Sequence, residues 1–166
     1  MANDELSLIE DRVGKRARVK AKERAILVGV DLSNFDENRL WTTTESIKEL
    51  ASLAKTAGVK IQKKVIQSRP KPDPKFYIGK GKAEEIREIA RDVGAQVVLF
   101  NEELRPAQSR NLEDKLGTKV VDRTQLIMDI FAQRAQTKEA KLQVELAQYE
   151  YLLPRLRGWG KSLERQ

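Results

Sequence analysis

The 166-residue sequence contains no histidine and no cysteine. Their absence excludes disulfide bonds, the usual zinc sites and every catalytic arrangement built on imidazole or thiolate. Aromatic residues make up only 5% of the chain. No apolar run approaches the roughly 20 residues that span a bilayer, and the N-terminus lacks the apolar core of a signal peptide. We expect a soluble, cytoplasmic protein without a metal site or a membrane span.

Basic residues are in excess, because 32 Lys and Arg stand against 25 Asp and Glu, a net charge of +7. Such an excess favours polyanionic partners, with nucleic acid or the ribosome as the first candidate, although it can also serve solubility alone. Part of it lies near the N-terminus, where seven basic side chains occur between Arg12 and Arg24 without a core pattern. We predict a basic flexible arm over residues 1–23.

From residue 24 to residue 123 the pattern alternates between strands and helices. Strands are predicted from short apolar or alternating runs, over 25–30, 59–67, 95–100 and 118–122. Helices are predicted from apolar residues at helical spacing, over 42–58, 83–93 and 106–116. Thr42 and Glu45 fit a capping box at the first of these helices. The β-α-β-α-β-α-β order predicts an α/β domain with a four-stranded parallel sheet flanked by helices.

Residues 124–166 are predicted to form a second unit. No glycine or proline occurs from Thr124 to Leu153, so a long C-terminal helix of about 29 residues, roughly 44 Å, is expected. Its later apolar residues follow the spacing of a coiled-coil seam, at Ala135, Leu142, Leu146, Tyr149 and Leu153. A seam this narrow needs a partner helix. Either two chains pair through it, or the chain ends at the tip of a helical hairpin in a coiled-coil-like subdomain.

Two glycine-containing stretches fall short of nucleotide motifs. Before Gly160-Lys161-Ser162, the P-loop requires a glycine where Arg155 stands, and it also requires a preceding strand. The pair Gly79 and Gly81 lacks the third glycine of the dinucleotide fingerprint, which Glu84 replaces. A helix N-terminus with adjacent lysines could still hold a phosphate, at Gly79, Lys80, Gly81 and Lys82. The alternative is a tight turn with solvated lysines.

Acidic residues follow two of the predicted strands. Asp31 follows the first strand, while Glu102 and Glu103 follow the third, so these side chains could converge on Mg²⁺ at the carboxyl edge of the sheet. We expect exposed loop carboxylates instead of a metal site.

The last residues combine arginine, glycine and tryptophan. Arginine forks grip phosphates, an indole stacks on an unpaired base, and glycine permits close approach of the backbone. We predict an RNA-contacting tip, with a frayed terminus as the alternative. Its residues are Arg155, Arg157, Gly158, Trp159, Lys161 and Arg165.

Several long motifs occur in a fixed order: "RPKPDPKFYIGKGKAEEI", "LFNEELRPAQSRNLE", "VVDRTQLIMDIFAQRAQTKEAKLQVELAQYEYLLPRL" and "RGWGKSLERQ". Over about residues 24–166 the chain resembles the N-terminal half of the HflX family of translational GTPases. The resemblance implies an α/β domain, a two-helix subdomain and then a GTPase domain beyond Gln166 that would hold GTP and Mg²⁺. This chain would then hold no cofactor and would not itself be an enzyme.

The resemblance also implies partners. They are the large ribosomal subunit with its rRNA, in the splitting or rescue of stalled ribosomes, and the protein's own G domain. The six tip residues would reach toward the peptidyl-transferase centre, and we expect a monomer. Two alternatives remain open: a nucleotide-binding or hydrolysing α/β domain that uses the Gly79–Lys82 loop for ATP, and a homodimeric scaffold joined through the coiled-coil seam.

Overall fold

A computed structural model describes residues 19–32 and 37–155 of the chain. Its strands are β1 (Arg24–Asp31), β2 (Lys60–Ser68), β3 (Val97–Phe100) and β4 (Lys119–Asp122). They form one sheet in the order β2-β1-β3-β4, and every neighbouring pair is parallel. The predicted four-stranded parallel sheet is confirmed, with β1 and β3 in its centre.

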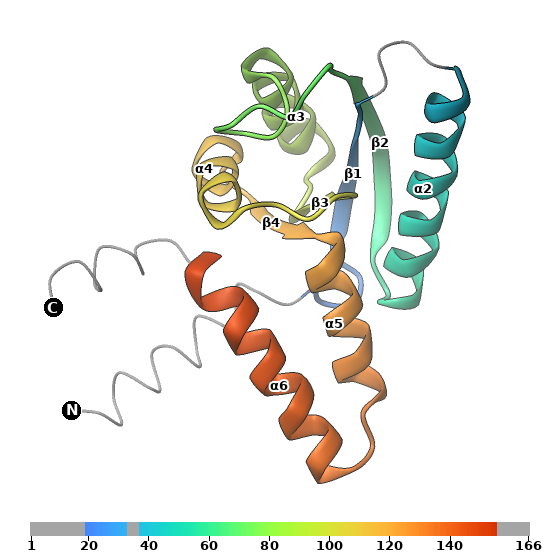
Figure 1. Cartoon of the computed structure of the whole chain (residues 1–166), viewed down its shortest axis with the longest axis vertical. Coiled ribbons are helices and arrows are strands. Elements are labelled where there is room, and N and C mark those ends of the chain that lie inside the picture. Colours follow the sequence, from blue (N-terminus) through green and yellow to red (C-terminus); the bar gives the residue numbers. More distant parts are fainter. Residues whose placement is uncertain (1–18, 33–36, 156–166) are drawn as a thin grey trace, which may run out of the picture.

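Helices cover both faces of this sheet (Figure 1). The helical elements are α2 (Glu37–Thr56), α3 (Lys80–Val93), α4 (Pro106–Leu116), α5 (Arg123–Arg134), α6 (Lys138–Leu152) and the 3₁₀ turn η1 (Leu153–Arg155). Side chains alternate along β1, so Ile26 and Val28 join the core beneath α3 and α4, whereas Ala25 and Leu27 join the core beneath α2 and α5. Burial on both faces explains why β1 reads as one continuous apolar run.

β2 forms one edge of the sheet, and its exposed residues include Lys60, Lys63 and Lys64. Charged side chains on an edge strand hinder pairing with the strands of another molecule. This position accounts for the alternating, half-polar sequence of β2.

Two helices begin earlier than predicted. α2 starts at Glu37 and includes Thr42, so the capping box predicted at Thr42 and Glu45 is wrong. Residues 37–41 contain neither glycine nor proline, so the helix extends through them to Glu37. α3 starts at Lys80, with Gly79 as its N-cap. The predicted ends are confirmed, because Gly94 and Gly117 close α3 and α4 with φ of 63° and 64°.

A long C-terminal helix is confirmed as α6, but the predicted single helix over 124–153 is wrong, because the structure divides it into α5 and α6. Ala135 is extended, with a ψ of 124°, and the Thr137 hydroxyl accepts a hydrogen bond from Ala140 N at 3.1 Å. This side-chain cap starts a new helix without glycine or proline. α6 then packs on α5, where Gln148 Nε2 donates to Asp129 Oδ1 at 2.7 Å in a buried contact.

The described part of the predicted arm, residues 19–23, packs on the domain. Val19 is buried, and its backbone N–H donates to Asp129 Oδ2 at 3.0 Å. Glu23 is also buried and pairs with Lys119 at 2.8 Å. The prediction of a flexible arm is therefore wrong for residues 19–23, because an apolar side chain and a buried ion pair hold them on the domain. Residues 1–18 lie outside the described part of the chain.

Among the helices of the described residues, none is long and apolar enough to cross a membrane.

Candidate functional site

Parallel strands end at the same edge of a sheet, and here they bring polar side chains together. Asp31, Asn101 and Asp122 lie at or directly after the ends of β1, β3 and β4, and all three are buried. The expectation of exposed carboxylates is therefore wrong for Asp31, while Glu102 is half-buried and Glu103 is exposed. Within the described ranges, no group of three His, Cys, Asp or Glu side chains could hold a metal ion.

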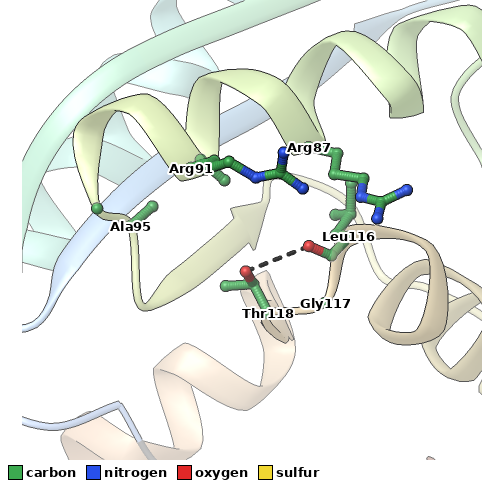
Figure 2. A pocket seen from close by; sticks show the side chains of 8 residues that line it. Arg87, Arg91, Ala95, Leu116, Gly117 and Thr118 are labelled. Atoms are coloured by element: carbon green, nitrogen blue, oxygen red, sulfur yellow. Dashed lines mark hydrogen bonds between the residues drawn. The ribbon is translucent and has the colours of Figure 1, made fainter.

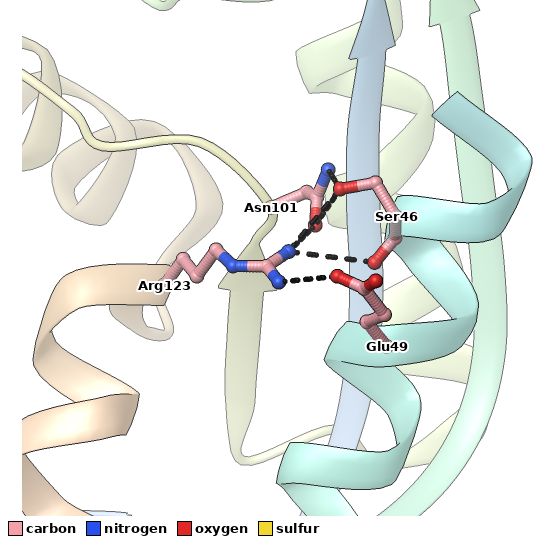
Figure 3. A network of polar contacts seen from close by, with 4 residues as sticks. All are labelled: Ser46, Glu49, Asn101 and Arg123. Carbon is pink, nitrogen blue, oxygen red and sulfur yellow. Dashed lines mark hydrogen bonds and ion pairs between the residues drawn. The ribbon is translucent and has the colours of Figure 1, made fainter. Parts of the chain in front are cut away.

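Arg123 reaches over this edge from the first position of α5 (Figure 3). Its Nη1 donates to Asn101 Oδ1 at 2.8 Å and to Ser46 Oγ at 3.2 Å, and its Nη2 lies 2.9 Å from Glu49 Oε2. Ser46 and Glu49 belong to α2, and Asn101 follows β3. The guanidinium thus joins three elements beside the β1–β3 boundary, where doubly wound sheets often bind ligands.

The sequence did not single out Arg123 or Ser46 as site residues. They are 77 positions apart, and neither belongs to a short motif. The only available signal was the position of Arg123 directly after a predicted strand, at the edge where ligand-binding residues gather.

Glu102 and Tyr77 form a second feature near the same edge. Burial raises the pKa of the half-buried Glu102 carboxyl, whose Oε1 lies 3.5 Å from Val30 N. Burial, aided by the negative charge of Glu102, raises the pKa of Tyr77 to about 12. Burial thus works against the charged form of both groups at this part of the edge.

Asp122 connects four segments. Its Oδ1 accepts from Gln125 N at 3.0 Å and so caps α5. Its Oδ2 accepts from Leu104 N at 3.0 Å and from the Tyr151 hydroxyl at 2.5 Å. Burial and this bond to Asp122 raise the pKa of Tyr151 well above its usual value. The end of β4 is therefore tied to the β3–α4 loop and to the last turn of α6.

Arg155, one of the predicted tip residues, lies against the α/β domain. Its Nη2 donates to Leu104 O and its Nη1 to Tyr151 O, both at 2.8 Å. The guanidinium carbon stands 3.6 Å from the centroid of the Tyr151 ring, and only 11% of the side chain is exposed. Arg110 donates to the carbonyl of Pro154 beside it. These contacts fix η1 beside α4.

This arrangement corrects the expected geometry of the C-terminal segment. Because the chain turns at 135–137, α6 returns to the α/β domain, and Arg155 does not lie at the far end of a straight 29-residue rod (Figure 1). The other predicted tip residues are outside the described part of the chain: Arg157, Gly158, Trp159, Lys161 and Arg165.

The Gly79–Lys82 loop is occupied by contacts within the protein. Gly79 N donates to Gln67 Oε1 at 2.9 Å, and a Cβ at this position would lie 2.7 Å from Arg69 Nη1. The near atom is the end of a flexible arginine side chain, so this contact alone does not require glycine. Lys82 pairs with Glu85 at 2.8 Å. Gly79 and Lys82 thus have partners within the protein, and the phosphate site stays a prediction.

The predicted coiled-coil seam is partly open. Leu142 and Leu146 are 57% and 59% exposed, and they line a largely apolar groove of about 480 Å³ on α6. Tyr149 and Leu153 are half-buried. α6 contacts α5 through the buried Gln148, and within residues 19–32 and 37–155 no segment covers the side that carries these two leucines.

Comparison with solved structures assigns the fold to a class of GTP-binding proteins. The chain is similar to a Sulfolobus solfataricus GTP-binding protein in complex with GDP, with 26% identity, a TM-score of 0.60 and coverage of 86% of this chain and 43% of that one. A structure described as SsGBP with GDP gives 28% identity and a TM-score of 0.64, with coverage of 86% and 39%.

Sequence comparisons narrow this class. The family model described as GTP-binding GTPase N-terminal matches residues 44–132, and the model of the GTP-binding GTPase middle region matches residues 134–166. The GTPase HflX of Alkalihalophilus pseudofirmus is 49% identical to this chain over 87% of its length, and that of Escherichia coli is 48% identical over 90%. The chain belongs to the HflX family, as its N-terminal region. It spans about a third of the length of these relatives, 33% and 34%.

Proposed function

We propose that this chain is the ribosome-binding part of an HflX-type GTPase. It binds the rRNA of the large subunit during the splitting or rescue of stalled ribosomes. A G domain outside these 166 residues binds GTP and Mg²⁺, hydrolyses GTP and is a further partner. The chain itself has no catalytic role and works as a monomer in the cytoplasm. Membership of the HflX family supports this proposal.

The observation that carries the proposal is the fixed base of the predicted tip. Arg155 is held by Leu104 and Tyr151, and Tyr151 is held by Asp122. The following segment contains Arg157, Trp159 and Lys161, the residue types that grip phosphates and stack on bases. In this assignment Arg155 anchors the base of the tip, and the later residues contact RNA, together with Gly158 and Arg165.

Pelleting with isolated large subunits tests the assignment. We expect Arg157→Glu combined with Trp159→Ala to weaken binding at least tenfold. Binding of the parent chain should also fall steeply with salt, because phosphate contacts release counterions. A matched control is Lys63→Glu combined with Ile66→Ala, which makes a comparable change on the exposed edge strand β2. If the tip variant pellets as well as the parent, the tip does not bind the subunit.

A second candidate function is a homodimeric scaffold, and the exposure of Leu142 and Leu146 on α6 favours it. Two copies of α6 would cover each other's apolar groove in the manner of a coiled coil. Sedimentation of the parent and of Leu146→Lys decides between the candidates. A parent chain that sediments as a monomer at all concentrations excludes the scaffold, whereas a dimer abolished by Leu146→Lys establishes it.

A further inference from the structure

A separate pocket lies between the C-terminal ends of α3 and α4, at the amino edge of the sheet (Figure 2). Its volume of about 380 Å³ is within the range of small-ligand pockets, about 300–1,000 Å³. The apolar part of its lining comes from Ala90, Ala95 and Leu116, and the cationic part from Arg87 and Arg91. None of these residues belongs to the proposed RNA-binding segment.

The two arginines are positioned to act together. Arg87 and Arg91 are four residues apart on α3, so their side chains leave the same face of the helix. Figure 2 shows both beside the turn formed by Leu116, Gly117 and Thr118. Two guanidinium forks on one face can hold a single tetrahedral anion with several charge-assisted hydrogen bonds.

Their charges are weakly compensated within the protein. Arg91 forms no ion pair with another residue of the described ranges, and Arg87 approaches Glu84 only to 3.8 Å. Glu84 is already bound more closely by Lys115, at 2.6 Å. The hydrogen bond from Lys115 is also the main cause of the lowered pKa of Glu84. The pocket therefore carries excess positive charge.

Helix C-termini expose carbonyl oxygens, which would repel an anion. Here several of those carbonyls accept hydrogen bonds within the protein. Arg24 Nε donates to Gly94 O at 2.8 Å, and Ala95 N donates to Ala90 O at 2.8 Å. The Thr118 hydroxyl lies 3.4 Å from Leu116 O. These bonds reduce the negative potential at the two helix ends, and the two guanidinium groups add positive charge beside them.

We propose that this pocket binds a small phosphorylated anion, a ligand class distinct from the RNA of the proposed function. Arg87 and Arg91 grip the phosphate, while Ala90, Ala95 and Leu116 contact the carbon skeleton of the ligand. The pocket volume suits a single compact molecule. Binding requires no chemical step, and it leaves the tip and its anchor Arg155 untouched.

Calorimetric titration of the 166-residue chain with pyrophosphate and with glycerol 3-phosphate, at constant ionic strength set by chloride, tests this proposal. Arg87→Gln combined with Arg91→Gln should weaken binding at least tenfold. Gly117→Asn should also weaken binding without a change of charge, because it adds a side chain at a residue of the pocket lining. Asparagine tolerates the left-handed backbone at this position, and an added Cβ meets nothing within 4 Å.

The control is Lys63→Gln combined with Lys64→Gln, which removes the same charge from β2, and it should bind within twofold of the parent. Equal losses in the control and in the arginine variant would show diffuse anion attraction and overturn the proposal. The proposal would also be overturned if titration of the folded parent with pyrophosphate and with glycerol 3-phosphate gave no heat of binding. Short single-stranded RNA is the third ligand to be tested, in competition with pyrophosphate. If RNA displaces pyrophosphate at far lower concentration, the pocket belongs to an RNA-binding surface and the small-ligand assignment is wrong.

Discussion

The Tyr151 hydroxyl donates to Asp122 Oδ2 across 2.5 Å, which joins the last turn of α6 to the end of β4. The same carboxylate caps α5 through Gln125 N. Both ends of the α5–α6 hairpin therefore depend on one side chain. Any change in the hydrogen bonding of Asp122 should affect how α6 lies on the domain.

Tyr151→Phe removes this hydrogen bond and keeps the ring beneath Arg155. We expect a loss of about 1–3 kcal/mol in the free energy of unfolding, the range for a bond to a charged group. Urea denaturation followed by circular dichroism measures it. A double-mutant cycle with Asp122→Asn should give a coupling of about 1 kcal/mol or more, and additive effects would contradict the direct contact.

Arg123→Ala should destabilise the chain by about 1–3 kcal/mol, because it leaves the buried Asn101 and the half-buried Ser46 without their charged donor. Arg123→Lys should recover little, since an ammonium cannot span three partners in the plane of a guanidinium. Glu49→Gln is the comparison, and it should cost well under 1 kcal/mol because the Glu49 side chain is 69% exposed. Equal effects of Arg123→Ala and Glu49→Gln would contradict this account.

The sheet and its helices could be predicted because their signals are local: short apolar runs, helical spacing, and glycines that end helices at Gly94 and Gly117. The turn at 135–137 could not be predicted. α6 starts at a Thr137 side-chain cap, and threonine also occurs at many positions that do not begin a helix, so the residue alone gives no clear signal. The Arg123 network and the packing of Arg155 were missed for another reason. They include the contacts of Arg123 with Ser46 and of Arg155 with Leu104, 77 and 51 positions apart, which no short motif records.

Alkaline pH should weaken the fold through Tyr77. Its folded-state pKa is about 12 against a usual 10.0, so the unfolded chain loses this proton first as pH rises. The stabilisation from neutral Tyr77 is complete below pH 10 and is lost between pH 10 and about 12. Tyr77→Phe should therefore show a shallower fall in stability over that interval, measured by urea titration at fixed pH values. Parallel curves for the two proteins would contradict the raised pKa.

Thr137→Ala removes the cap of α6 and should cost about 1 kcal/mol, whereas Thr137→Ser keeps the hydroxyl and should cost little. Amide hydrogen exchange gives the local readout. In Thr137→Ala the amides of Ala140 and Lys141, which donate to the Thr137 hydroxyl and carbonyl, should lose protection, while β1 and β3 should keep theirs up to the global stability. Unchanged exchange at these two amides would show that the cap does not stabilise α6.

Anchoring η1 beside α4 also has a mechanical consequence. A force applied to the chain beyond Arg155 is borne first by its bonds to Leu104 and Tyr151, not by the 135–137 turn at the opposite end of α6. The load then passes through Asp122 into β4 and the sheet. A force on the C-terminal segment should therefore be transmitted directly to the α/β domain, without first separating α5 from α6.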